Sequence, residues 1–289
     1  MAYGKKTYRY RNAIEVEESH SGRYGAPGQE RIKKKKPTPE QMEKVNLRNK
    51  EKLCRRKLRK WFRKEDIWAT LTYEVKERPQ DMKTAKDQFK DFVDEVREEY
   101  KKRGYILRWI RNIEVGTKNA WHTHVILNRI PDTDLIIAQA WPHGEVDMKP
   151  CYKKGEFREL AAYITKTPKT EKRLREASYS TSRNMPLPEP EKKTVRKWET
   201  WGEDVRIPKG FYLDKDSYHE GINPVTGYKY REYTLLRIEE KEEERDDRRS
   251  IYRDKPKRTG KRNRKDHVPD ADKEKKRGRP RKHPGSGGV

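Results

Sequence analysis

The sequence predicts an α+β protein with a central antiparallel sheet and helices packed against it. Short segments rich in β-branched and aromatic residues alternate with segments whose apolar residues recur every three or four positions. Two strand-like segments, residues 105–115 and 121–127, are separated by only a short turn, so they must run antiparallel. This order of elements excludes a doubly wound parallel sheet.

The composition limits both the size of the core and the choice of partner. Of 289 residues, 30% are apolar and 42% are charged, so one core over the whole length is implausible. Lysine and arginine outnumber aspartate and glutamate by 73 to 48, which gives a formal net charge of +25. This excess favours a nucleic-acid partner, because bound phosphates release condensed counterions; a ribosomal or membrane-surface protein is the alternative.

The cysteines and the apolar runs bear on the cell compartment. Cys54 and Cys151 lie far apart and in no CxxC arrangement, which argues against a disulfide framework and a thiolate zinc site. No apolar run approaches the roughly 20 residues needed to span a bilayer, and the N-terminal residues lack a signal-peptide pattern. We expect a protein of the bacterial cytoplasm without a membrane partner.

The first elements are a flexible basic segment and a basic helix. Residues 1–36 are polar and end in four lysines, so they are predicted to be flexible. Thr38, Pro39 and Gln41 form the pattern of a capping box at a helix start. We predict that basic side chains of this helix contact DNA, with an ordinary solvated face as the alternative: Arg55, Arg56, Arg59 and Lys60.

The elements that follow complete a predicted domain over residues 37–185. Gly104 is placed as the C-terminal cap of an amphipathic helix. The expected elements, in order, are a strand at 67–73, that helix over 82–100, strands at 105–115 and 121–127, a short helix at 135–141, a strand at 144–148 and a helix over 157–164 that ends before Pro168.

The remainder is predicted to be an extension and a tail. Residues 186–238 are expected to add accessory strands, one of them over 228–238. Residues 239–289 have almost no apolar residues and are predicted to be a disordered basic tail. Within it, residues 275–282 resemble an AT-hook, in which Arg277, Arg279 and Arg281 would bind a narrow A·T minor groove. A generic basic tail is the alternative.

Two histidines on a predicted strand suggest a metal site. His122 and His124 are two residues apart, so both imidazoles leave the same face. Glu114 is the nearest carboxylate on the preceding strand, and it shares that face only if the turn has an odd number of residues or a bulge. Two imidazoles and one carboxylate leave positions open for a phosphate oxygen, for which Mn²⁺ or Mg²⁺ is suited. A pair of surface histidines is the alternative.

A tyrosine on the last predicted helix is the candidate nucleophile. Tyr163 and Lys166 lie about one turn apart on a flank beside the apolar stripe. A nearby ammonium and a metal-polarised phosphate would both favour the phenolate over the phenol. A tyrosine at the edge of the core, beside a lysine that extends into solvent, is the alternative.

Together these motifs resemble the HUH endonucleases, and more closely the rolling-circle replication initiators with a single catalytic tyrosine. The similarity covers roughly residues 65–185. The motifs are Trp68–Thr72 with Thr70 and Thr72, then His122-Thr123-His124, then Tyr163-Ile164-Thr165-Lys166, with residues 141–146 as the joining segment. Thr123 departs from the large apolar residue usual at the middle of the second motif.

The resemblance implies a metal-dependent enzyme that cuts and rejoins one DNA strand. Tyr163 would form a 5′-phosphotyrosine bond, Glu114 would complete the metal ligands, and a host polymerase would extend the freed 3′-OH. The chain has no GxxxxGK[ST] motif, so the helicase would also come from the host. The partners expected are single-stranded and origin DNA. The alternatives are a conjugative relaxase or single-strand transposase of the same fold, or a non-catalytic DNA-binding regulator.

Overall fold

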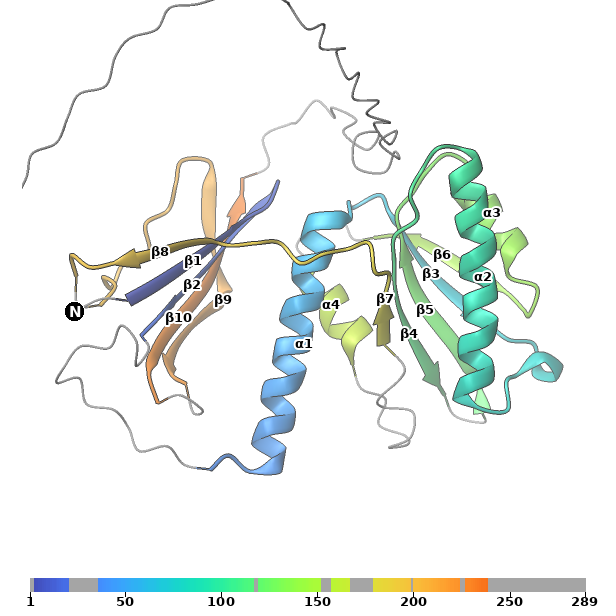
Figure 1. The fold of residues 1–289 in the computed structure, drawn as a ribbon, viewed down its shortest axis with the longest axis horizontal. Coiled ribbons are helices and arrows are strands. Elements are labelled where there is room, and N and C mark those ends of the chain that lie inside the picture. Colours follow the sequence, from blue (N-terminus) through green and yellow to red (C-terminus); the bar gives the residue numbers. More distant parts are fainter. Residues whose placement is uncertain are drawn as a thin grey trace, which may run out of the picture. The chain divides into compact units, whose positions relative to one another are not determined.

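The computed structural model describes residues 3–20, 36–116, 119–151, 157–166, 179–198, 200–223 and 227–238. These residues form two five-stranded antiparallel sheets, four α-helices and one short 3₁₀ helix, Val75–Glu77 (Figure 1). The predicted α+β class is therefore confirmed. The basic tail with Arg277, Arg279 and Arg281 lies outside the described residues.

Sheet B, as we name it, corresponds to the central sheet predicted from the sequence. Its strands are adjacent in the order β6 (Val146–Pro150), β3 (Ile67–Thr72), β5 (Trp121–Leu127), β4 (Trp109–Val115) and β7 (Tyr179–Thr181). Every neighbouring pair is antiparallel. Strand β7 was not predicted, because its three residues are too short for a period to show.

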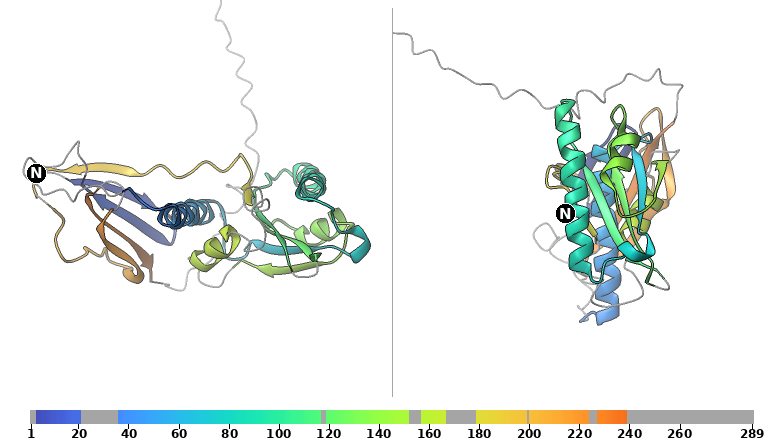
Figure 2. Two further views of the ribbon diagram at one scale, coloured as in Figure 1. Left: turned by 90° about the horizontal axis from the view of Figure 1, so that it is seen from below. Right: turned by 90° about the vertical axis from the view of Figure 1, so that its right-hand side faces the viewer.

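Helices cover both faces of sheet B. On one face, α2 (Met82–Lys102) and α3 (Thr133–Ala140) enclose a core that includes Leu71, Phe92 and Val125. On the other, α1 (Pro39–Trp61) and α4 (Arg158–Thr165) share a smaller core with Ile110 and Ile126. Figure 2 shows α2 standing against the strands of this sheet. Because successive side chains of a strand point to opposite faces, the polar residues described below lie on the α1 and α4 face of β3, β4 and β5.

The predicted start of α1 and the predicted end of α2 are confirmed. Thr38 and Gln41 form the capping box before α1. The chain leaves α2 through Gly104, whose φ of 76° belongs to the left-handed region that glycine adopts without strain. Among the described residues, no helix is both long enough and apolar enough to cross a bilayer.

Thr123 is buried on the α2 side of sheet B. It is 0% exposed, and its hydroxyl has no hydrogen-bond partner among the described residues. A buried hydroxyl without a partner destabilises the folded state. We therefore expect Thr123→Val to raise the free energy of unfolding by about 1 kcal/mol, measured by urea denaturation.

The control for this substitution is Thr133→Val. Thr133 is also buried, but its hydroxyl accepts a hydrogen bond from the Ile130 amide at 2.7 Å and donates one to the Ile130 carbonyl. Its loss should lower the free energy of unfolding. Equal destabilisation by both substitutions would contradict the account of Thr123.

Sheet A, as we name the second sheet, combines both ends of the described chain. Its strands are adjacent in the order β8 (Glu191–Val195), β1 (Tyr3–Arg9), β2 (Ala13–Ser19), β10 (Lys229–Arg237) and β9 (Phe211–Ile222). Ile14 and Val16 pack with Tyr233 and Leu235 on one of its faces. Strand β10 lies where an accessory strand was expected.

The expectation that residues 1–36 are flexible is wrong for residues 3–19, which include β1 and β2. The polar appearance of β2 has a physical reason. Glu15 and Glu17 alternate with Ile14 and Val16, and these carboxylates face α1, with Glu15 buried and Glu17 half-buried. Their burial is compensated by cations that lie more than 30 positions away in the sequence.

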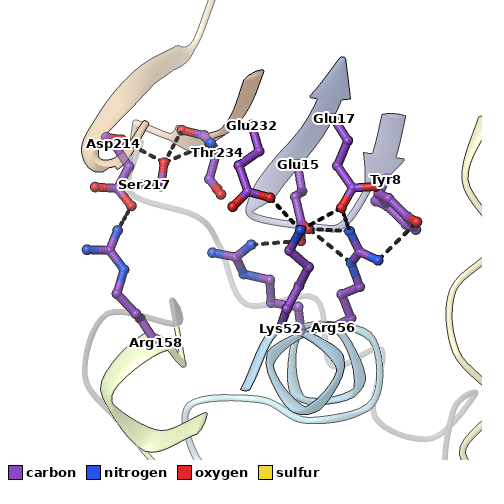
Figure 3. Close-up of polar contacts among 11 residues, drawn as sticks. Tyr8, Glu15, Glu17, Lys52, Arg56, Arg158, Asp214, Ser217, Glu232 and Thr234 are labelled. Atoms are coloured by element: carbon purple, nitrogen blue, oxygen red, sulfur yellow. Dashed lines mark hydrogen bonds and ion pairs between the residues drawn. The ribbon is translucent and has the colours of Figure 1, made fainter. Parts of the chain in front are cut away.

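An ion-pair network joins α1 to sheet A (Figure 3). The Arg56 guanidinium lies 2.6 Å from a Glu15 carboxylate oxygen and 2.7 Å from one of Glu17. Arg59 lies 3.5 Å from Glu15, and Lys52 pairs with both Glu17 and Glu232. Removal of one partner of such a buried pair leaves an uncompensated charge, so the network fixes which face of α1 meets the sheet.

The network corrects part of the predicted DNA contact of α1. Arg56 and Arg59 are only 7% and 6% exposed and are paired with glutamate, so they do not present an open cationic surface. Arg55 and Lys60 are half-buried, and the Lys60 ammonium lies 4.8 Å from the centroid of the Trp61 ring. For these two, contact with DNA stays a prediction.

Candidate metal and nucleophile site

The pairing of β4 with β5 brings three metal-ligand side chains to one face of sheet B. Glu114 lies directly opposite His122 in the strand register. The connecting residues 116–120 are odd in number, as the shared face requires. One Glu114 carboxylate oxygen lies 3.5 Å from His122 Nε2 and 3.9 Å from His124 Nε2. The three ligand atoms all lie within 4.8 Å of one another, so they could hold one ion.

Hydrogen bonds orient both imidazoles. His122 Nδ1 lies 3.2 Å from the Ala120 carbonyl oxygen, which can only accept, so Nδ1 carries a proton and Nε2 presents its lone pair whenever the imidazole is neutral. His124 Nδ1 lies 3.1 Å from the Thr70 hydroxyl, which can accept from it in the same way. Such contacts to the second ring nitrogen are typical of metal-binding histidines.

Thr72, the other threonine of this strand, has a different contact. It lies opposite His122 in the strand register, but its hydroxyl donates to the Glu145 carbonyl oxygen at 2.9 Å. Thr72 therefore hydrogen-bonds to the segment that precedes β6 and does not orient an imidazole.

The electrostatics of the triad suit a cation. Burial, together with the neighbouring His122, lowers the pKa of His124 to about 4, so its imidazole is neutral near pH 7. Burial alone would raise the pKa of Glu114. The hydrogen bond with His122 and the charges of His124, His122 and Lys166 instead hold it below its usual value. A hydrogen bond to Glu114 raises the pKa of His122. An ionised carboxylate beside a neutral imidazole matches the ligand chemistry of a divalent cation.

Asn112 is a site residue that the sequence reasoning missed. It is 0% exposed, and its amide nitrogen donates to Glu114 Oε1 at 3.1 Å and to the Lys166 carbonyl oxygen at 3.3 Å. It thus joins the carboxylate of the triad to the end of the tyrosine helix. Its position two residues before Glu114 on the same strand is the signal that could have identified it.

Tyr163 reaches the triad from α4. Its hydroxyl lies 3.3 Å from His124 Nε2, and the residue is 44% exposed. The Trp68 ring meets the Tyr163 ring edge-on, with 5.3 Å between centroids, and tilts against the His124 ring. Burial and the nearby Glu114 charge raise the pKa of Tyr163. Ionisation of the phenol is therefore unfavourable unless positive charge is added to the site, which would lower its pKa.

Lys166 lies just beyond the helix rather than on its flank, which corrects the sequence interpretation. Helix α4 ends at Thr165, and the Lys166 amide donates to the Tyr163 carbonyl oxygen at 3.2 Å as a cap. The side chain is exposed, and its charge contributes to the lowered pKa of Glu114. It therefore remains near the triad.

The segment before β6 closes against the end of β3. The Trp141 indole donates to the Thr72 carbonyl oxygen at 2.8 Å, and the Glu74 amide donates to the His143 carbonyl oxygen at 2.9 Å. A Cβ atom on Gly144 would lie 2.5 Å from the Thr72 carbonyl oxygen and 2.9 Å from the Glu74 nitrogen. Backbone atoms cannot move aside as a flexible side chain can, so the segment requires glycine here.

We expect Gly144→Ala to lower the free energy of unfolding by about 1–3 kcal/mol, the usual range for an overpacked position. Urea denaturation measures the change. Gly202→Ala is the control, because a Cβ atom there would have nothing within 4 Å. If both variants unfold at the same urea concentration as the unmodified chain, the close approach at Gly144 does not constrain the fold.

Comparison with known proteins supports a replication role. Residues 66–168 match the family model of the replication-associated protein ORF2. No curated protein and no solved structure matched the chain. The matched segment begins just before β3 and ends just after α4, so it contains the triad, Tyr163 and Lys166. The central part of the chain is therefore similar to replication-associated proteins.

Proposed function

We propose that this protein is a rolling-circle replication initiator that nicks and rejoins a single DNA strand. The observation that carries the proposal is the 3.3 Å separation between the Tyr163 hydroxyl and His124 Nε2 of the triad. An exposed candidate nucleophile and a set of partly buried candidate metal ligands thus lie at one place. The match to replication-associated proteins covers the same residues.

Each side chain has a role in the proposed reaction. Glu114, His122 and His124 would hold a divalent cation, Mn²⁺ or Mg²⁺, which supplies Lewis-acid polarisation of a phosphate oxygen when bound. Thr70, the Ala120 carbonyl and Asn112 orient these ligands. The Tyr163 hydroxyl loses its proton and its oxygen attacks the phosphorus atom. A P–O bond to tyrosine forms, the bond to the 3′ oxygen breaks, and the 3′ oxygen takes up a proton and leaves as a 3′-OH. Lys166, whose charge acts on the neighbouring Glu114, would supply positive charge to the site.

The products of the proposed reaction indicate which partner proteins it needs. A 5′-phosphotyrosine bond conserves the energy of the phosphodiester, so rejoining by the reverse reaction needs no nucleotide. The freed 3′-OH would be extended by a host polymerase, with strand separation by a host helicase, in the bacterial cytoplasm. Trp68, half-buried beside Tyr163, offers an aromatic face near the unpaired strand. Arg55, Lys60 and the AT-hook-like residues of the tail are the proposed contacts with origin DNA.

The test is covalent capture. The full chain is incubated with Mn²⁺ and fluorescent single strands that tile the origin of its genetic element, and the products are separated under denaturing conditions. We expect a protein–DNA adduct whose phosphotyrosine maps to Tyr163 by peptide mass spectrometry. Absence of an adduct on every strand, with DNA binding retained, would favour the non-catalytic regulator. An adduct formed only on a transfer origin or a transposon end would favour the relaxase or the transposase.

A further inference from the structure

The helix that carries Tyr163 is short and depends on contacts outside itself. Helix α4 has 8 residues, and a helix of that length is not stable alone in water. Its apolar side packs into the small core through Ala161 and Ile164. At its C-terminal end, Asn112 donates to the Lys166 carbonyl oxygen. At its N-terminal end, the N-cap residue Phe157 is buried in the same core.

Sheet A provides a second, polar contact at the N-terminal end of α4. The guanidinium of Arg158, the first residue of α4, pairs with the Asp214 carboxylate of β9 (Figure 3). The Asp214 side chain is 11% exposed, whereas the Arg158 side chain is 31% exposed. A second carboxylate, Asp216, lies 3.5 Å from Arg158, but its side chain is 86% exposed. Asp214 is therefore the desolvated partner, and Asp216 is a solvated neighbour of the same cation.

A bulge in β9 sets the position of Asp214. Asp214 pairs with Thr234, and the next pair is His219 with Glu232, so residues 215–218 stand opposite Tyr233 alone. The Ser217 hydroxyl closes the interrupted ladder: it accepts from the Thr234 amide at 2.8 Å and donates to the Asp214 carbonyl oxygen at 2.7 Å. Bulges of this kind redirect a side chain at a fixed place in a sheet.

We propose that Asp214 is a positioning residue for the Tyr163 nucleophile, and that sheet A acts in the reaction through this contact. The inference rests on the proposed function. Tyr163 lies five positions after Arg158 on the same short helix, so a tilt at the N-terminal end moves the phenol relative to His124. Displacement of a reacting atom by about 1 Å can lower a rate by about 100-fold. Asp214 lies outside the segment that matches the replication-associated family.

The test compares Asp214→Asn with Asp216→Asn in the full chain. At saturating oligonucleotide and Mn²⁺, we expect Asp214→Asn to lower the rate constant of adduct formation by about tenfold, less than a full displacement of about 1 Å would cost. Its KM for the oligonucleotide should stay unchanged, because the residue does not touch the strand. Asp216→Asn should retain the rate of the unmodified chain, and Asp214→Glu should recover part of it.

A readout without chemistry separates this inference from the proposed function. Hydrogen–deuterium exchange of the amides of residues 158–165 should become faster in Asp214→Asn and remain unchanged in Asp216→Asn. If exchange in α4 is the same in all three proteins, the positioning role is overturned, whether or not an adduct forms. Faster exchange with an unchanged adduct rate also overturns it. If the unmodified chain forms no adduct, the proposed function fails, and unchanged exchange would still show that Asp214 does not hold the helix.

Discussion

If the proposed function is right, replacement of Tyr163 by phenylalanine should abolish the protein–DNA adduct, because the variant lacks the oxygen atom that would bond to phosphorus. The substitution should leave the fold unchanged, since the residue is 44% exposed and its ring keeps the edge-on contact with Trp68. We expect no adduct at the longest incubation that keeps the protein folded, with DNA affinity close to that of the unmodified chain. Denaturing electrophoresis measures the first and fluorescence anisotropy the second.

The control is Tyr212→Phe in sheet A. Tyr212 is exposed to a similar extent, 49%, but it lies on β9, and no contact links it to the triad among the described residues. This variant should form the adduct at the rate of the unmodified chain. An adduct that persists in Tyr163→Phe and maps to another tyrosine would remove Tyr163 from the mechanism and require a new nucleophile.

Loss of one triad imidazole has the second-largest expected effect. His124→Ala removes the ligand nearest to Tyr163 and also opens space beside Trp68. We expect adduct formation to slow by about 100- to 1000-fold, the range for removal of one preorganised electrostatic group. Calorimetric titration with Mn²⁺ should show weaker binding, and chelation by EDTA should stop the reaction of the unmodified chain.

His219→Ala is the matched control, because His219 is exposed on β9 and does not belong to the triad. It should bind Mn²⁺ and react as the unmodified chain does. Should His124→Ala retain full Mn²⁺ affinity and full reaction rate, the triad is not the metal site, even if Tyr163 remains the nucleophile.

The Mn²⁺ affinity of the triad should depend on pH. A proton and a cation compete for the Nε2 of a histidine. The hydrogen bond to Glu114 raises the pKa of His122, whereas His124, with a pKa of about 4, stays neutral down to acidic pH. Mn²⁺ affinity should therefore be full above the pKa of His122 and fall as the pH drops through it, with His122 as the first ligand lost.

Much of sheet B could be predicted because its signals are local. Segments rich in β-branched and aromatic residues identified the strands β3, β4 and β5, and the short turn showed that β4 and β5 are antiparallel. The three- and four-residue spacing identified α2. Sheet A was missed at its N-terminal end because the inward residues of β2 are Glu15 and Glu17. A buried glutamate looks like a solvated one until its partners, Arg56 and Lys52, are known to face it.

The candidate site was also predictable from the sequence only in part. His122, His124 and Glu114 could be placed together because strand alternation and the odd loop length depend only on residues close in sequence. The same argument could have placed Asn112 at the site, but its uncharged side chain does not stand out as a candidate ligand. The contact of Arg158 with Asp214 spans 56 positions and depends on a bulge, so no local pattern contains it.

The pairing of β2 with β10 has a consequence during synthesis on the ribosome. Residues 13–19 must wait for residues 229–237 to be translated before their hydrogen-bond ladder can form. The strands and helices of sheet B lie between them and can assemble in that interval, since their contacts are closer in sequence. A nascent chain stalled before β9 would thus already display the triad and Tyr163, while Arg158 still lacked its carboxylate partner.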